Sequence, residues 1–91
     1  MNFELIYSSQ FKKDFKKIAN NPKKVKPLVT ALNILTETGS LPIATYKTHE
    51  LKGNFKGCME AHILSDFLII WFIVEKNQIN IVRIGSHSDL F

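Results

Sequence analysis

Hydrophobic residues change their spacing along the chain, and each spacing predicts a different element. Residues 3–7, FELIY, alternate apolar and polar side chains, which is typical of a strand with one buried face. The next apolar residues are spaced by three and four positions, with lysines between them: Phe11, Phe15, Ile18 and Ala19. This spacing predicts an amphipathic helix of about three turns that begins after Ser8 or Ser9.

A second helix is predicted after the sequence NNP at residues 20–22. Its apolar stripe is Val25, Leu28, Leu32 and Leu35. Pro27 has no amide hydrogen, so we expect the regular helix to begin near Lys24, which places Pro27 in the first turn, where no intrahelical donor is needed. Gly39 and Pro42 predict the end of this helix.

Three further strands are predicted after an irregular connection over residues 43–57. They are CMEAHIL, FLIIWFIV and INIVRI. The second is apolar on both faces, which indicates a central strand, and short turns predict antiparallel neighbours. The order β-α-α-β-β-β predicts one α+β domain over residues 1–91, with a helical hairpin packed on one face of a four-stranded, mostly antiparallel sheet.

Composition narrows the classes of partner. The net charge of +4, with lysines concentrated in FKKDFKKIANNPKKVK, favours a polyanion such as nucleic acid, although helix lysines are more often a solvated face. The single cysteine excludes an internal disulfide. The first residues lack the basic and apolar regions of a signal peptide, and no apolar run approaches the roughly 20 residues of a membrane helix. We therefore expect a cytoplasmic protein without a membrane partner.

All three histidines, His49, His62 and His87, lie in the second half of the chain. Alternation in CMEAHIL predicts that Glu60 and His62 share the open face of the sheet, whereas Met59, Ala61 and Ile63 face the helices.

In the last strand, alternation places Val82 and Ile84 on the core face and Arg83 on the open face. Arg83 is then able to pair with Glu60 across the sheet. His87 has the same parity as Arg83 if no bulge intervenes. The loop with His49 and Lys52 leads toward this face, and Asp66 lies in the turn beside His62. The sequence therefore predicts that the histidines converge.

Three chemistries are compatible with such a cluster. Zinc binding by the histidines and Asp66 fits the residue types, but the close ligand pairs of a zinc motif are absent from the sequence. A serine hydrolase is suggested by Ser86, His87 and Asp89, but these residues are too close in sequence to converge as a triad.

Metal-independent RNA cleavage fits the residue set best. It needs a base for the ribose 2′-OH, an acid for the leaving 5′-oxygen and cations for the phosphorane charge. Histidine serves as acid or base near neutral pH, and Arg83 and Lys52 are able to hold the phosphate. Exposed aromatic rings stack on unpaired bases.

The segment THELKGNFKGCMEAHILSDFLIIWFI, followed by IVRIGSHSDLF, closely resembles the YafQ-type branch of the RelE/ParE toxin superfamily. The likeness is most specific at HELKG, EAHILSD and RIGSHSDLF. It implies a RelE-like fold and the toxin of a type II toxin–antitoxin system. The implied activity is metal-independent, ribosome-dependent cleavage of mRNA in the A site, with no cofactor. The implied partners are a cognate antitoxin and, only through it, operator DNA.

The resemblance also implies roles for single residues. His87 matches the principal general acid, and His49, His62 and Asp66 match residues that assist proton transfer or position the substrate. Arg83 matches the phosphate-binding arginine, with Glu60 beside it. Phe91 matches an aromatic residue that orients RNA, and Phe67 replaces a tryptophan with its stacking ring retained. Met59 stands where relatives often have arginine, which removes one phosphate contact.

A non-catalytic module of the same fold is the alternative. Such a protein would occupy the ribosome or bind nucleic acid without cutting it. Fold does not separate the two, because function depends on the site.

Overall fold

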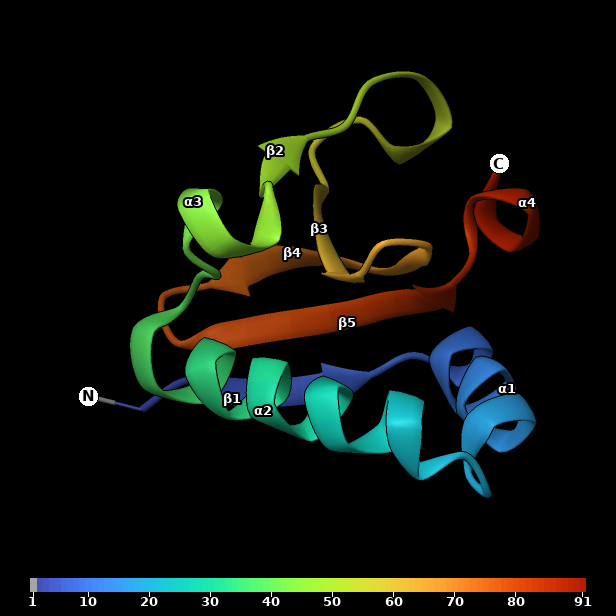
Figure 1. Cartoon of the computed structure of the whole chain (residues 1–91). Helices are drawn as coiled ribbons and strands as arrows, with labels where there is room; N and C mark the ends of the chain where they lie inside the picture. The colour runs from blue at the N-terminus through green and yellow to red at the C-terminus, as the bar shows by residue number, and fades with distance from the viewer. Residues whose placement is uncertain (1) are drawn as a thin grey trace.

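The computed structural model describes residues 2–91 and contains a five-stranded sheet in the order β1-β5-β4-β3-β2 (Figure 1). The strands are β1 Glu4–Tyr7, β2 His49–Glu50, β3 Met59–Leu64, β4 Phe67–Glu75 and β5 Gln78–Gly85. β1 runs parallel to β5, and every other neighbouring pair is antiparallel. The predicted α+β class, the antiparallel neighbours and the central position of β4 are confirmed.

The predicted strand count is wrong by one. The additional strand is β2, in which His49 and Glu50 pair with Glu60 and Met59 of β3. Two residues are too few to produce a visible alternation, which explains why the pattern of residues 43–57 did not predict it.

Helices α1, Ser9–Ile18, and α2, Pro22–Thr38, cover one face of the sheet. Ser8 caps α1, because its side chain accepts a hydrogen bond from the Phe11 amide at 2.9 Å. Short helical segments follow at α3, Ile43–Tyr46, η1, Gly53–Phe55, and α4, His87–Leu90. None of the helices within residues 2–91 has the length and apolar character that crossing a membrane requires.

Helix α2 begins earlier than its proline predicted. Asn21 caps it and Pro22 is its first residue, so Pro27 lies inside the helix and not in the first turn. The missing Pro27 amide would have bonded to the carbonyl of Lys23. Lys23 is exposed, so water is able to satisfy that carbonyl. Gly39 ends the helix in a left-handed conformation, as predicted.

Apolar side chains fill both faces of β4. Toward the helices, Phe67, Ile69 and Trp71 join the main core, with Leu28 and Leu35 of α2. On the opposite face a smaller cluster contains Leu68, Ile70 and Leu90. This second cluster anchors α4 to the sheet, because Leu90 is 7% exposed.

Alternation fails at one position of β5. The register between β4 and β5 shifts from the Ile70–Arg83 pair to the Trp71–Ile81 pair, which leaves Val82 as an extra residue. Val82 therefore packs with the smaller cluster and not with the core. Such a bulge changes which side chains beyond it share a face.

Candidate active site

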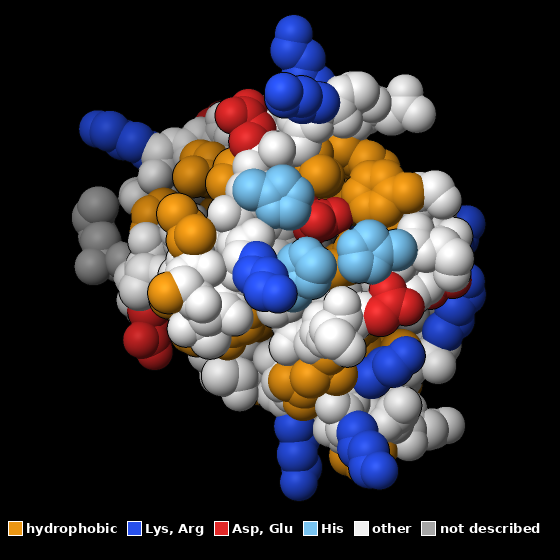
Figure 2. All heavy atoms as spheres, turned by 45° about the horizontal axis from the view of Figure 1, so that its top comes forward, with side chains coloured by type: hydrophobic (Ala, Val, Ile, Leu, Met, Phe, Trp, Pro, Cys, Tyr) orange, Lys and Arg blue, Asp and Glu red, His pale blue; other side chains and the backbone are white. Residues whose placement is uncertain are grey.

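The three histidines gather on the open face of the sheet, with an acidic side chain between them (Figure 2). His49 comes from β2, His62 from β3 and His87 from the first position of α4. The ring centroids of His62 and His87 are 5.6 Å apart. The predicted convergence is confirmed. We call His49, Glu60, His62, Asp66 and His87 the histidine cluster.

Asp66 fixes His87 through two contacts. Its Oδ1 accepts hydrogen bonds from the His87 amide at 2.9 Å and from Nδ1 at 2.7 Å. These bonds from His87 lower the pKa of Asp66, so the carboxyl is ionised at neutral pH. A carboxylate only accepts hydrogen bonds, so Nδ1 carries a hydrogen and Nε2 is the ring atom that exchanges protons.

Glu60 lies between the other two histidines. Its Oε1 is 3.3 Å from Nε2 of His49 and 4.0 Å from Nε2 of His62. Nδ1 of His49 also faces an acceptor, the Lys47 carbonyl at 3.0 Å. Each ring nitrogen of His49 thus lies near an oxygen acceptor.

Burial changes the role predicted for Glu60. The residue is 4% exposed, so its carboxylate is shielded from any ligand on the surface. The prediction of a substrate contact does not fit this position. Its Oε1 instead lies within 4.0 Å of the two histidines that flank it.

The turn before His87 is fixed by its own side chains. Ser86 and Asp89 form a capping box: the Ser86 oxygen accepts from the Asp89 amide at 3.2 Å, and the Asp89 carboxylate accepts from the Ser86 amide at 3.0 Å. The Ser86 contacts lower the pKa of Asp89. A Cβ at Gly85 would lie 3.1 Å from the Asp89 Cβ, so the glycine lets this turn pack closely.

These contacts also exclude the triad considered from the sequence. Asp89 caps the helix, and the acidic partner of His87 is Asp66. A zinc site is not supported either, because no group of three His, Cys, Asp or Glu residues within residues 2–91 has an arrangement that would hold a metal ion.

Arg83 pairs with Asp14 of α1 and not with Glu60. Its Nε and one terminal nitrogen donate to the Asp14 carboxylate at 3.0 and 2.9 Å, a bidentate contact. Burial would raise the pKa of Asp14, but hydrogen bonds from Arg83, Gln10 and the Ile84 amide outweigh it and lower that pKa. The Arg83 side chain is 22% exposed, so its remaining N–H groups are still able to meet a ligand.

Phe91 follows α4 and is 62% exposed. Its amide bonds to the His87 carbonyl at 2.9 Å. Its ring meets Phe55 of η1 edge to face, with centroids 5.7 Å apart. An exposed ring one helical turn from His87 is therefore held in a defined position.

Comparison with known proteins decides the family. The family model described as the bacterial toxin of type II toxin–antitoxin systems, YafQ, matches residues 3–91. The chain belongs to the YafQ family.

Individual relatives support this membership over almost their whole length. The mRNA interferase toxin YafQ of Escherichia coli K12 is 36% identical, covering 97% of this chain and 95% of that protein. The structure of the E. coli DinJ–YafQ toxin–antitoxin complex matches with a TM-score of 0.84 and 32% identity, over 100% of this chain and 99% of the other. The metal-bound toxin from Helicobacter pylori matches with a TM-score of 0.82 and 35% identity, over 100% of both chains.

One residue predicted for the site of this YafQ-family chain lies elsewhere, and a second makes no ion pair there with the residues that the structure describes. Phe67 is 2% exposed and belongs to the core on the helix side of the sheet, so its ring is not available for stacking on a base. Lys52 is exposed in the loop before η1, and within residues 2–91 it makes no ion pair with the histidine cluster.

Asp14 and Phe55 were not predicted from the sequence. Asp14 lies on the apolar stripe of α1, between Phe11 and Phe15, and a carboxylate on a core-facing stripe needs a cationic partner. Arg83 is the only arginine in the chain and was the available candidate. Phe55 lies in an irregular segment without periodicity, and its spacing gave no indication of its contact with Phe91.

Proposed function

We propose that this YafQ-family toxin is an endoribonuclease that cleaves mRNA on the ribosome by acid–base catalysis without a metal. The observation that carries the proposal is the hydrogen-bonded pair of Asp66 and His87, beside His62 and an exposed ring. The E. coli relative is named as an mRNA interferase, which supports the same activity class for this chain.

His87 is the proposed general acid. In the reaction, the ribose 2′-oxygen attacks the adjacent phosphorus, and the bond from phosphorus to the 5′-oxygen breaks. The imidazolium of His87 gives the proton on Nε2 to the leaving 5′-oxygen, and the products are a 2′,3′-cyclic phosphate and a 5′-hydroxyl. Asp66 holds the ring through Nδ1, which leaves Nε2 as the atom that transfers the proton.

His62 and His49 are the proposed proton acceptors or positioning groups for the 2′-OH. Glu60 lies between them, and the ring of His62 contacts that of His87, with centroids 5.6 Å apart. His62 is therefore our first candidate for the base. The His49 ring, held between two acceptors, is the alternative proton acceptor or a positioning group.

Arg83 and Phe91 are the proposed substrate-binding residues. Arg83 uses two N–H groups on Asp14, which leaves other donors of its guanidinium for a phosphate oxygen. Phe91 stacks on a base next to the scissile bond, as exposed rings do in single-strand binding. Lys52 contributes charge from the loop.

Antitoxin binding is part of the proposal. The E. coli YafQ structure is a complex with the antitoxin DinJ. We expect a cognate antitoxin for this chain as well, with operator DNA reached only through that partner. A partly disordered acidic segment of that antitoxin would neutralise the excess positive charge of this toxin.

The deciding experiment compares wild type with His87→Ala in a translating extract. Wild type should cut mRNA at ribosome-bound codons, and His87→Ala should cut it at least about 100-fold more slowly. Addition of a chelator selective for transition metals should leave the wild-type rate unchanged. Arrest of translation by wild type with intact mRNA would instead identify a non-catalytic ribosome-binding module.

A further inference from the structure

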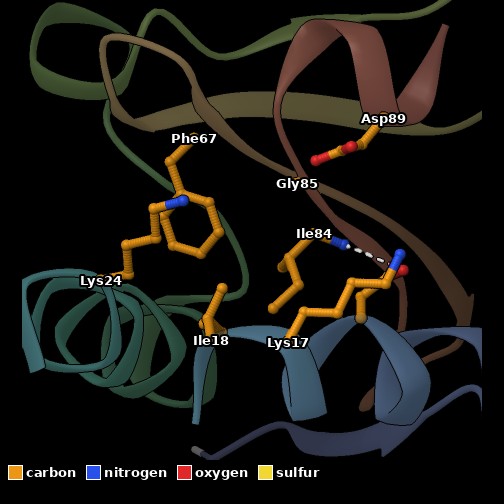
Figure 3. A pocket seen from close by; sticks show the side chains of 8 residues that line it. Lys17, Ile18, Lys24, Phe67, Ile84, Gly85 and Asp89 are labelled. Carbon is orange, nitrogen blue, oxygen red and sulfur yellow. Dashed lines mark hydrogen bonds between the residues drawn. The ribbon is translucent and has the colours of Figure 1, made fainter. Parts of the chain in front are cut away.

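A small hollow lies between helices α1 and α2 and the segment that joins β5 to α4 (Figure 3). Lys17 and Lys24 enter it from opposite sides, and Asp89 and Gly85 lie above it. Its free space is about 30 Å³, which is room for about one water molecule. Neither lysine takes part in the proposed proton transfers.

Lys24 is held in place by an aromatic ring. Its Nζ lies 5.5 Å from the centroid of Phe67, within the range of a cation–π contact (Figure 3). The ring itself is fixed, because Phe67 is 2% exposed in the core. Lys24 is only partly exposed, in contrast to its exposed neighbour Lys23. The core thus directs this one ammonium group toward the hollow.

The position of Lys24 connects the hollow to the histidine cluster. Phe67 directly follows Asp66, the partner of His87. Hydrogen bonds from His87 are the main cause of the lowered pKa of Asp66, and the charge of Lys24 lowers it further. Lys24 and Lys17 likewise add to the effect of Ser86 on Asp89. Both ammonium groups are therefore near the base of α4.

Neither lysine is neutralised by an ion pair. Among residues 2–91, the ion pairs within 4.0 Å do not include Lys17 or Lys24, whereas Arg83 is bound to Asp14. Two carboxylates, Asp14 and Asp89, line the hollow with the lysines. Asp14 is bound to Arg83, and Asp89 accepts a hydrogen bond from the capping turn. Because both carboxylates are engaged with other groups, the ammonium groups of the two lysines keep their N–H donors free for a ligand.

Substrate chemistry requires such donors. Arg83, the arginine of the site, has its charge balanced by Asp14. We propose that Lys24, assisted by Lys17, binds a backbone phosphate of single-stranded RNA beside the nucleotide held at His87. The hollow is too small for a nucleotide, so the strand would cross its mouth. This inference rests on the proposed function, because it deepens the binding of the same substrate.

A binding measurement with a non-cleavable RNA tests the proposal without catalysis. The probe is a short single-stranded RNA with 2′-O-methyl groups, which removes the attacking hydroxyl. Affinity is measured by fluorescence anisotropy over a range of salt concentrations for wild type, Lys24→Gln and Lys23→Gln. Lys23→Gln is the matched control, because it removes the same charge from the adjacent, exposed position.

We expect Lys24→Gln to bind several-fold more weakly at low salt, for any RNA sequence. The slope of log affinity against log salt should fall by about 0.7, the value for one lost phosphate contact on a single strand. Lys23→Gln should keep the wild-type slope, and Lys24→Arg should retain it because both charge and ring contact persist. Lys24→Met, which keeps the apolar stem over Phe67, repeats the comparison if glutamine alters the unfolding temperature.

Equal slopes for wild type and Lys24→Gln would overturn the proposal, as would the absence of salt-dependent binding by wild type. Failure of the proposed function gives a different result. Wild type would then bind the RNA probe with a steeper dependence of log affinity on log salt than Lys24→Gln, but it would leave mRNA on ribosomes intact.

Discussion

One carboxylate oxygen of Asp66 accepts two hydrogen bonds from His87: Oδ1 lies 2.9 Å from the His87 amide nitrogen and 2.7 Å from its Nδ1. The backbone bond positions the start of α4, and the ring bond selects the nitrogen that carries the hydrogen. A single side chain therefore fixes both the place and the tautomer of the proposed acid.

Asp66→Asn should lower the rate of mRNA cleavage about 10-fold or more, and His87→Ala about 100-fold or more. If Asp66 acts only through His87, the double mutant should be no slower than His87→Ala alone. Single-turnover cleavage on programmed ribosomes measures all three rates. Additive losses would show that Asp66 has a separate role at the substrate.

Asp14→Asn should destabilise the fold by about 2 kcal/mol, because it removes a charge-assisted contact with Arg83 and leaves the guanidinium partly buried. Urea unfolding measures the change in the free energy of unfolding. Glu37→Gln, an exposed substitution on α2, is the control and should change it by less than about 0.5 kcal/mol.

Acid should weaken the contact between Asp14 and Arg83. The pKa of Asp14 is lower in the folded state than in the unfolded chain, where it is about 3.9. Its contribution to stability is thus complete above that value and is lost as the pH falls through the folded pKa. The free energy of unfolding of wild type should decrease below about pH 4 more steeply than that of Asp14→Asn. Parallel pH curves would mean that the Arg83 contact does not depend on the charge of Asp14.

Removal of the Phe91 ring should impair cleavage far more than folding. Stacking on one base is worth about 1–3 kcal/mol, which predicts a loss of cleavage efficiency of roughly 5- to 150-fold for Phe91→Ala. The free energy of unfolding should change little, because the ring is 62% exposed. Phe91→Tyr should retain activity, and Val29→Ala is a control for loss of an exposed apolar side chain on α2. Full activity of Phe91→Ala would mean that the ring only packs on Phe55 and does not contact the substrate.

The sequence predicted the elements that repeat regularly and missed those that depend on a single local event. Alternation in β3 correctly placed Glu60 and His62 on the open face, because that strand keeps its period through both residues. In β5 the bulge at Val82 interrupts the alternation of faces, and no residue in the sequence indicates that bulge. The turn at Asp66 was visible, but its bond to His87 depends on where α4 lies.

The site was predictable in its residue types and less so in its contacts. The three histidines converge as expected, because strands that pair bring their ends together. Arg83 was assigned a partner on the sheet, whereas its carboxylate comes from a helix 69 positions earlier. Phe67 was assigned to the substrate because the resemblance places it where relatives have a tryptophan, but the strand directs its ring into the core on the helix side.

The parallel pairing of β1 with β5 also fixes the order in which the molecule can be assembled during synthesis. Glu4 pairs with Gln78, so the first strand emerges from the ribosome long before its neighbour has been translated. Arg83 and His87 follow later still, which means that a nascent chain has neither the Asp14 contact nor the histidine cluster. Contacts so distant in sequence also slow folding. The translation machinery therefore completes most of this chain before the chain can form the surface proposed to act on that machinery.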